Sequence, residues 1–296
     1  MQRRYAPPMG RISRTLELAK ASWQVLKADK ELLLLPVLSL IATIAVAASF
    51  LAPLVLSGDA TTIEDPGPVG YALLFVAYVV LAFITIFFNA ALVHAANERM
   101  DGGDPTVGSA IGGAMGRIHR IFPWALASAT VSVILRAIEE RAGVVGRIVS
   151  GIAGVAWSLV TFLVIPVLVV EDIGVVDAVK RSGTLFKRTW GENVAAQVGF
   201  GLLGFVAVLP GLLVLAGGIA AGGSIAVLAV AVAVLWILLV AMVLSALNGI
   251  FQTALYRYAA EVDAPGAFGG HDLNAAFAPK QGRGGSSWTG GGFGGN

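Results

Sequence analysis

The chain has 296 residues, of which 57% are hydrophobic and 13% are charged, and its mean hydropathy is +0.82. This composition excludes an ordinary soluble globular domain. The lack of cysteine excludes disulfides and a thiol nucleophile. The net charge is only +2, but seven of the 20 Lys and Arg residues fall in the first 30 positions, so their placement is informative.

Residues 10–31 predict an amphipathic helix. Its apolar stripe follows helical spacing, and Lys and Arg flank it, which is typical of a helix in the lipid headgroup region. The stripe consists of Ile12, Leu16, Ala19, Trp23 and Leu26. Charged residues delay the first apolar run to about position 32, so we expect a retained first span. Cleavage after a signal peptide, at the A-x-A pattern Ala45-Val46-Ala47, is the alternative.

Six apolar segments predict membrane spans, because about 20 apolar residues cross the roughly 30 Å hydrocarbon layer. They pair as three hairpins, at about residues 33–56 with 71–94, 121–138 with 148–170, and 194–215 with 225–247. The third span is ambiguous, since its uncharged run from Ile121 to Leu135 has 15 residues. We expect Arg136 to snorkel to the outer interface and to pair with Glu140 at i+4.

The distribution of basic residues predicts the orientation. Six spans place 17 basic residues on one side and 3 on the other, whereas omitting the third span gives 13 and 7. The positive-inside rule therefore favours six spans in the cell membrane, with both termini cytoplasmic. We predict an all-α, polytopic transmembrane helix bundle over residues 1–263, in which cytoplasmic amphipathic helices accompany the spans.

The last 33 residues, 264–296, include 11 glycines and predict a disordered, Gly-rich cytoplasmic tail. A linker role is the simpler interpretation, and binding of a partner by Trp288 and Phe293 is the alternative.

An element with the spacing R-[ST]-x2-L-x-K-x2-W occurs at residues 14–23 and again at residues 181–190, each time before a hairpin. Such a parallel repeat differs from the inverted repeats of many secondary transporters. The basic and aromatic residues in and beside both copies are candidate contacts for anionic headgroups on the cytoplasmic side. They are Arg14, Lys20, Trp23, Lys27, Lys180, Arg181, Lys187, Arg188 and Trp190. Packing against the bundle, with basic residues placed only by the positive-inside rule, is the alternative.

Four segments carry a family resemblance: AIGGAMGRIHRIFPWA at 110–125, WSLVTFLVIPVLVVE at 157–171, AVKRSGTLFKRTWGEN at 178–193 and ALYRYA at 254–259. Together they resemble a family of six-helix integral membrane proteins of unknown function from bacteria and archaea, over roughly residues 10–280. The Arg-Ser/Thr and Trp element is more distantly similar to the membrane domains attached to some glycerophosphodiester phosphodiesterases. The resemblance implies the topology and supplies no catalytic residue.

Enzymatic motifs are missing from the sequence. The spans hold no acidic or basic residue in their apolar runs, and the three histidines, His94, His119 and His271, are too scattered for a metal motif. We therefore expect no enzymatic activity, no cofactor and no nucleic-acid partner.

Polar side chains near the cytoplasmic ends of three spans form a candidate polar vestibule for a lipid headgroup or a polar solute. They are Asn89, His94, Asn193, Gln197, Asn248 and Gln252. Hydrogen bonding between helices is the alternative. Glycines in the fifth span, among them Gly204 and Gly211, predict close helix packing, with a broken transporter helix as the alternative.

These observations favour a lipid-associated scaffold or accessory subunit with an unknown membrane-protein partner. A small-solute or lipid permease is the second candidate.

Overall fold

The computed structural model describes residues 22–27, 29–57 and 67–263, and every regular element in these ranges is helical. This confirms the predicted all-α fold. The predicted tail, and the predicted amphipathic helix before residue 22, lie outside the described residues. Residues 22–27 are helical, and the labelled elements follow in chain order. They are η1 (Lys30–Leu33), α2 (Leu34–Ser57), α4 (Gly67–Met100), α5 (Val107–Gly116), α6 (Ile118–Arg141), α7 (Gly143–Thr161), α8 (Val164–Val170), α9 (Val175–Ala221) and α10 (Gly223–Asp263).

Among the described residues, six helical segments are long and apolar enough to cross a membrane, which confirms the predicted number of spans. They are Lys30–Pro53, Gly67–Met100, Ile118–Arg141, Gly143–Val170, Val198–Ala221 and Gly223–Ala260. The third span reaches full length because α6 continues beyond its uncharged run. In this continuation Arg136 Nε lies 3.3 Å from Glu140 Oε1, which confirms the predicted i, i+4 pair.

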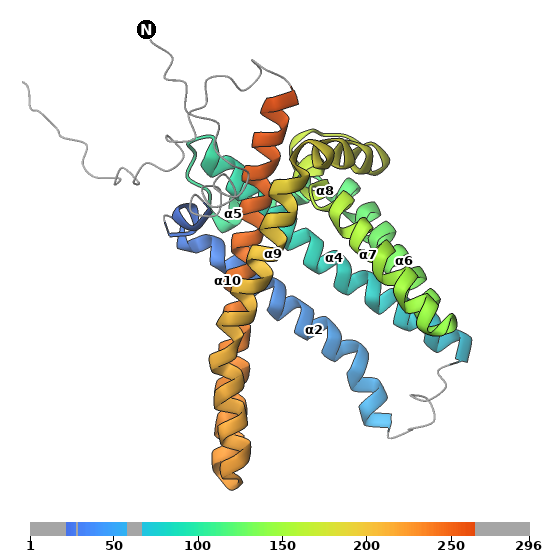
Figure 1. Ribbon diagram of the computed structural model, residues 1–296, viewed down its shortest axis with the longest axis vertical. Helices are drawn as coiled ribbons and strands as arrows, with labels where there is room; N and C mark the ends of the chain where they lie inside the picture. The colour runs from blue at the N-terminus through green and yellow to red at the C-terminus, as the bar shows by residue number, and fades with distance from the viewer. Residues whose placement is uncertain (1–21, 28, 58–66, 264–296) are drawn as a thin grey trace, which may run out of the picture.

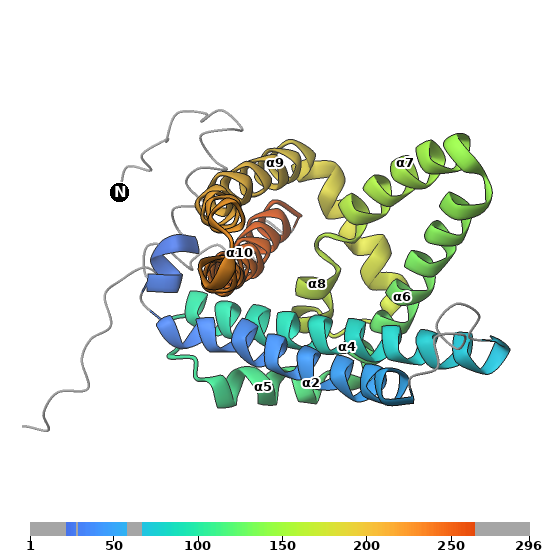
Figure 2. The same cartoon turned by 90° about the horizontal axis from the view of Figure 1, so that it is seen from below.

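The spans pack as three hairpins: the first is α2 with α4, the middle one α6 with α7, and the last one α9 with α10. Tight turns close the middle and last hairpins. Gly143 and Gly222 occupy these turns with φ of 57° and 70°, a left-handed conformation that favours glycine. Figure 1 shows that the hairpins meet at one end and that the last hairpin diverges from the other two. Figure 2 shows the last hairpin set apart from α6 and α7, beside α4.

The end where the hairpins meet holds the main hydrophobic core, and we call it the hub. Its buried apolar side chains come mostly from residues 87–100 of α4, 163–169 of α8 and 246–260 of α10. Gly249 allows close contact between two of these helices, since a β-carbon at this position would lie 2.5 Å from Leu92 Cδ2 of α4. Beyond the hub, the hairpins expose large apolar side chains such as Leu73, Val144 and Leu213. We call these regions the far ends.

One serine secures the break between α7 and α8. The Ser182 hydroxyl donates to the carbonyl of Val160 at 2.5 Å and accepts from the backbone N–H of Leu163 at 3.2 Å. Because Ser182 is fully buried, it pairs two backbone groups that the break would otherwise leave without partners. The fourth span can therefore consist of two helices.

Helix α9 combines two predicted elements, an amphipathic helix and the fifth span. Its dihedral angles are non-helical at Thr189, where φ is −118° and ψ is 24°, so the chain bends there. The preceding residues, 175–188, form the entry segment. This segment buries a face made of Ala178, Ser182 and Leu185, whereas Val176 is 66% exposed. The entry segment thus packs on the hub through this face.

The last hairpin is held together by a glycine seam, which consists of Gly204, Gly211 and Gly218 of α9. A β-carbon at these positions would meet Leu244, Trp236 and Ala229 of α10, respectively. The indole of Trp236 also donates to the carbonyl of Ala207 at 2.8 Å. The predicted close packing is confirmed for Gly204 and Gly211. The alternative of a broken helix there is wrong, since α9 is continuous between them.

Candidate functional site

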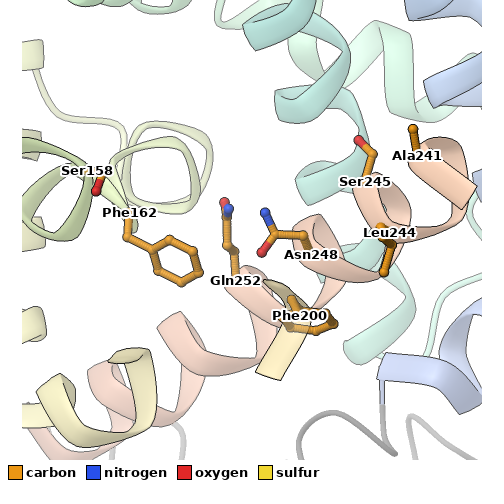
Figure 3. A pocket seen from close by; sticks show the side chains of 8 residues that line it. All are labelled: Ser158, Phe162, Phe200, Ala241, Leu244, Ser245, Asn248 and Gln252. Atoms are coloured by element: carbon orange, nitrogen blue, oxygen red, sulfur yellow. The ribbon is translucent and has the colours of Figure 1, made fainter. Parts of the chain in front are cut away.

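A pocket of about 530 Å³ lies between α7 and the last hairpin. The C-terminal end of α7 contributes Ser158 and the adjoining Phe162, and α9 contributes Phe200. One face of α10 supplies the other lining residues, Ala241, Leu244, Ser245, Asn248 and Gln252. Figure 3 shows the amides of Asn248 and Gln252 projecting toward the same space, with the ring of Phe162 on its other side. The pocket therefore combines two amides and two hydroxyls with an aromatic and aliphatic wall.

Gln252 is the most deeply buried polar group of this pocket. The residue is 6% exposed, and its Oε1 atom has no hydrogen-bond partner among the described residues. An unsatisfied buried polar atom costs about 1–3 kcal/mol. An amide offers both donors and an acceptor, so the pocket can hold a hydrogen-bonding group that satisfies this oxygen.

The structure brings together only part of the predicted vestibule. Asn248 and Gln252 line the pocket. Asn89 lies against α10, because its Oδ1 atom would be 3.2 Å from a β-carbon at Gly249. His94 packs instead on the Gly113 backbone of α5, away from the pocket lining. Of the two residues predicted on α9, Asn193 and Gln197, only the helical backbone is described.

Two polar pocket residues, Ser158 and Ser245, were not predicted as site residues. Ser245 precedes Asn248 and Gln252 by three and seven positions, so all three fall on one helical face. This helical spacing could have identified Ser245 from the sequence. Ser158 comes from a distant helix, and no local spacing connects it to α10.

Ion pairs and hydrogen bonds join the elements of the hub. Arg99 Nε of α4 lies 2.9 Å from Asp29 Oδ2, and both side chains are buried. Arg257 of α10 donates to Asp101 Oδ1 at 2.7 Å and to Asn97 Oδ1 at 3.0 Å. These contacts tie α4 to the chain before η1 and to α10.

A second group of hub contacts centres on Glu171, directly after α8. Its carboxylate accepts from Arg181 Nε at 2.9 and 3.1 Å and from the Tyr256 hydroxyl at 3.0 Å. The neighbouring Asp172 pairs with Arg120 of α6. Glu171 thus connects the entry segment to α10, and Asp172 connects the chain after α8 to the middle hairpin.

The predicted headgroup contacts have different surroundings. The Lys27 ammonium lies 5.3 Å from the centre of the Trp23 ring, and this indole is 44% exposed. Lys180 lies beside Asp177 at 3.5 Å, and Lys187 and Arg188 are exposed on the entry segment. Arg181 has an internal partner, Glu171, as described above. The side chain of Trp190, and the residues Arg14 and Lys20, lie outside the described part of the chain. Headgroup contact stays a prediction for all of them.

Comparison with protein families finds a match for this chain. Residues 68–266 match a family described as a family of unknown function (DUF6159), which covers more than half of the chain. The chain matches no curated protein.

Proposed function

The chain belongs to this family of unknown function, and we propose that it is a non-enzymatic scaffold or accessory subunit that binds other membrane proteins through its far ends. The observation that carries the proposal is the contrast between a self-contained hub and far ends rich in exposed apolar side chains. In the candidate span Val198–Ala221, only 6% of the most apolar window is buried within the chain. The last hairpin diverges from the other two, and its exposed apolar side chains can contact helices of a partner.

We infer that the hub faces the cytoplasm. Most basic residues of the described spans and connections lie there, including Arg117, Arg120 and Arg257, whereas Arg136, Arg141 and Arg147 lie at the far end of the middle hairpin. The positive-inside rule supports this orientation and a location in the cell membrane. Exposed Lys27, Lys180 and Lys187 then contact anionic headgroups, each contributing about 1 kcal/mol.

A topology test addresses this orientation. We expect a tag in the 60–65 loop to be accessible from outside the cell and a tag after Gly282 to be protected in intact cells. The reverse labelling pattern overturns the orientation but leaves the scaffold role untouched.

The second candidate function, a permease, is favoured by the pocket that contains Asn248 and Gln252. A permease needs a polar path across the membrane. Between the pocket and its far end, however, α10 has only apolar residues from Ile225 to Leu235. This stretch favours the scaffold over the permease.

We infer a bacterial or archaeal origin and a distant relationship to the membrane domains of glycerophosphodiester phosphodiesterases. Such a relationship fits a membrane domain that supports other proteins.

Native mass spectrometry combined with site-specific photo-cross-linking tests the scaffold role. A photoreactive amino acid replaces Leu203 or Leu213 on α9, both exposed at the far end, and Val176 of the entry segment serves as an exposed control. We expect a stoichiometric membrane-protein partner in the spectrum of the gently released protein, with cross-links from the two α9 positions exceeding those from the control. A lone protein that cross-links only to lipid overturns the proposal.

A further inference from the structure

The pocket beside α10 is a candidate ligand site, and its function does not depend on the scaffold role. It holds a buried amide, Gln252, whose Oε1 atom lacks a hydrogen-bond partner among the described residues. Asn248 lies one turn away on the same face of α10, and Ser158 faces this helix from α7. This arrangement provides hydrogen-bonding groups on both sides of one space.

Among the residues that the structure describes, the pocket lining is uncharged. All eight of these lining residues are apolar, hydroxyl-bearing or amide-bearing, so none of them neutralises a phosphate or an ammonium group. Burial of an unpaired charge is strongly unfavourable, whereas a hydroxyl or an ester carbonyl can pair with Asn and Gln side chains. The chemistry of the lining therefore selects an uncharged, oxygen-bearing group.

The position of the pocket and the exposure of its lining residues indicate the side from which a ligand enters. Ser158, Ala241 and Ser245 are exposed at the mouth of the pocket, which lies among helices long enough to span a membrane. Gln252 precedes Arg257 by five residues, or about 7.5 Å along α10. This places the amides just inside the charged end of the hub, near the depth at which a lipid has its glycerol and ester groups.

We propose that the pocket binds the uncharged head of a neutral glycerolipid, of the diacylglycerol class, which enters sideways from the bilayer. Asn248 and Gln252 hydrogen-bond its hydroxyl and ester oxygens, and Ser158 and Ser245 border the head. Phe162, Phe200 and Leu244 contact the first carbons of its acyl chains, and the remaining chain lies along the apolar far end of the last hairpin.

Binding to the purified full chain tests this assignment by native mass spectrometry. The probes are dioleoylglycerol and dioleoylphosphatidylglycerol, with free glycerol as a competitor. We expect a stoichiometric dioleoylglycerol adduct that excess glycerol does not displace, and weaker binding of the phosphatidylglycerol. Equal binding of the charged lipid, or displacement by free glycerol, overturns the proposal.

Replacement of the amides separates specific from adventitious binding. The double variant Asn248→Leu/Gln252→Leu should lose roughly tenfold in dioleoylglycerol affinity, as expected for the loss of one to two hydrogen bonds. The control is Thr253→Val, which also removes a buried polar group of α10, one that bonds to the carbonyl of its own Gly249. We expect the control to keep wild-type affinity. Unchanged affinity in the double variant, or an equal loss in the control, contradicts the proposal.

Photo-cross-linking provides a test that keeps both amides. Phe162, which lines the pocket, is replaced by p-benzoylphenylalanine, and the matched position is Phe205, which is exposed on α9. We expect dioleoylglycerol to label the Phe162 position more strongly than phosphatidylglycerol does, with no such preference at Phe205. The same lipid preference at both positions overturns the proposal even if the double variant fails to fold.

Discussion

The hub and the far end of the last hairpin are both helical, but different forces hold them. In the hub, charged side chains pair across elements distant in sequence, as in Arg99 with Asp29 and Arg257 with Asp101. At the far end of the last hairpin, uncharged parts of α9 and α10 pack along the glycine seam. Polar pairing therefore helps to tie the three hairpins together in the hub, whereas close packing along the glycine seam, with the hydrogen bond from Trp236 to Ala207, pairs the far parts of α9 and α10. This difference predicts different responses to substitution.

The largest loss of stability is expected from a substitution in the hub. Arg99→Leu leaves the buried carboxylate of Asp29 without its ion-pair partner and should lower the free energy of unfolding by about 3–5 kcal/mol. Reversible unfolding in mixed micelles measures this change. The double variant Asp29→Leu/Arg99→Leu removes both charges and should recover most of the loss. A double variant no more stable than Arg99→Leu would contradict an ion-pair role.

The next effect tests the glycine seam. Gly218→Val forces side-chain atoms into Ala229 and should cost about 1–3 kcal/mol through overpacking. Gly217→Val is the matched control, because a β-carbon at Gly217 has no neighbour within 4 Å among the described residues. The same unfolding assay compares the two variants. Equal losses in the free energy of unfolding would contradict close packing at the glycine seam.

A smaller effect is expected at the break in the fourth span. Ser182→Ala leaves the carbonyl of Val160 and the N–H of Leu163 unpaired, which should cost about 1–2 kcal/mol. Thr184→Ala is the control, since this exposed hydroxyl bonds only within its own helix, to the carbonyl of Lys180. Thermal unfolding in detergent distinguishes the two variants, and indistinguishable transitions would count against the role of Ser182.

The smallest effect is a pH dependence at the exposed edge of the hub. The hydrogen bond from Arg120 lowers the pKa of Asp172 below its ordinary value. A lowered folded-state pKa stabilises the fold above the unfolded-state pKa, and this contribution is lost as the pH falls through the folded-state value. Asp172→Asn should therefore be slightly less stable than the wild type at neutral pH, and the difference should vanish in acid. Melting temperatures measured across pH check the convergence, and a constant difference would contradict it.

Asparagine suits this comparison at position 172. Asp172 has a φ of 57°, a left-handed conformation that Asn also tolerates. The substitution therefore changes the charge and leaves the backbone conformation acceptable.

Local sequence patterns predicted the spans, the pairing of Arg136 with Glu140 and the close packing at Gly204 and Gly211. These features depend on residues within a few helical turns of each other or on total apolar length. The sequence also placed Asn248 and Gln252 on one face of α10, where they line the pocket.

Local sequence patterns did not predict the contacts that join the hairpins. Glu171 accepts hydrogen bonds from Arg181, ten residues away, and from Tyr256, 85 residues away, and no spacing rule connects three such positions. Arg181 consequently looked like a headgroup ligand. His94 was predicted in the vestibule because, like Asn89, it lies near the cytoplasmic end of the second span, but its side chain packs on α5, against Gly113.

The close approach at Gly249 has a mechanical consequence. Helix α10 has 41 residues and contacts α4 closely at Gly249. This contact is a point about which the helix can pivot. The arm from Gly249 to Gly223 spans about 39 Å, and the arm to Arg257 about 12 Å. A sideways push of about 4 Å at the outer tip would then move Arg257 by about 1.2 Å in the opposite direction. That displacement would disturb its 2.7 Å contact with Asp101, so a movement at the far end of α10 would reach an ion pair in the hub.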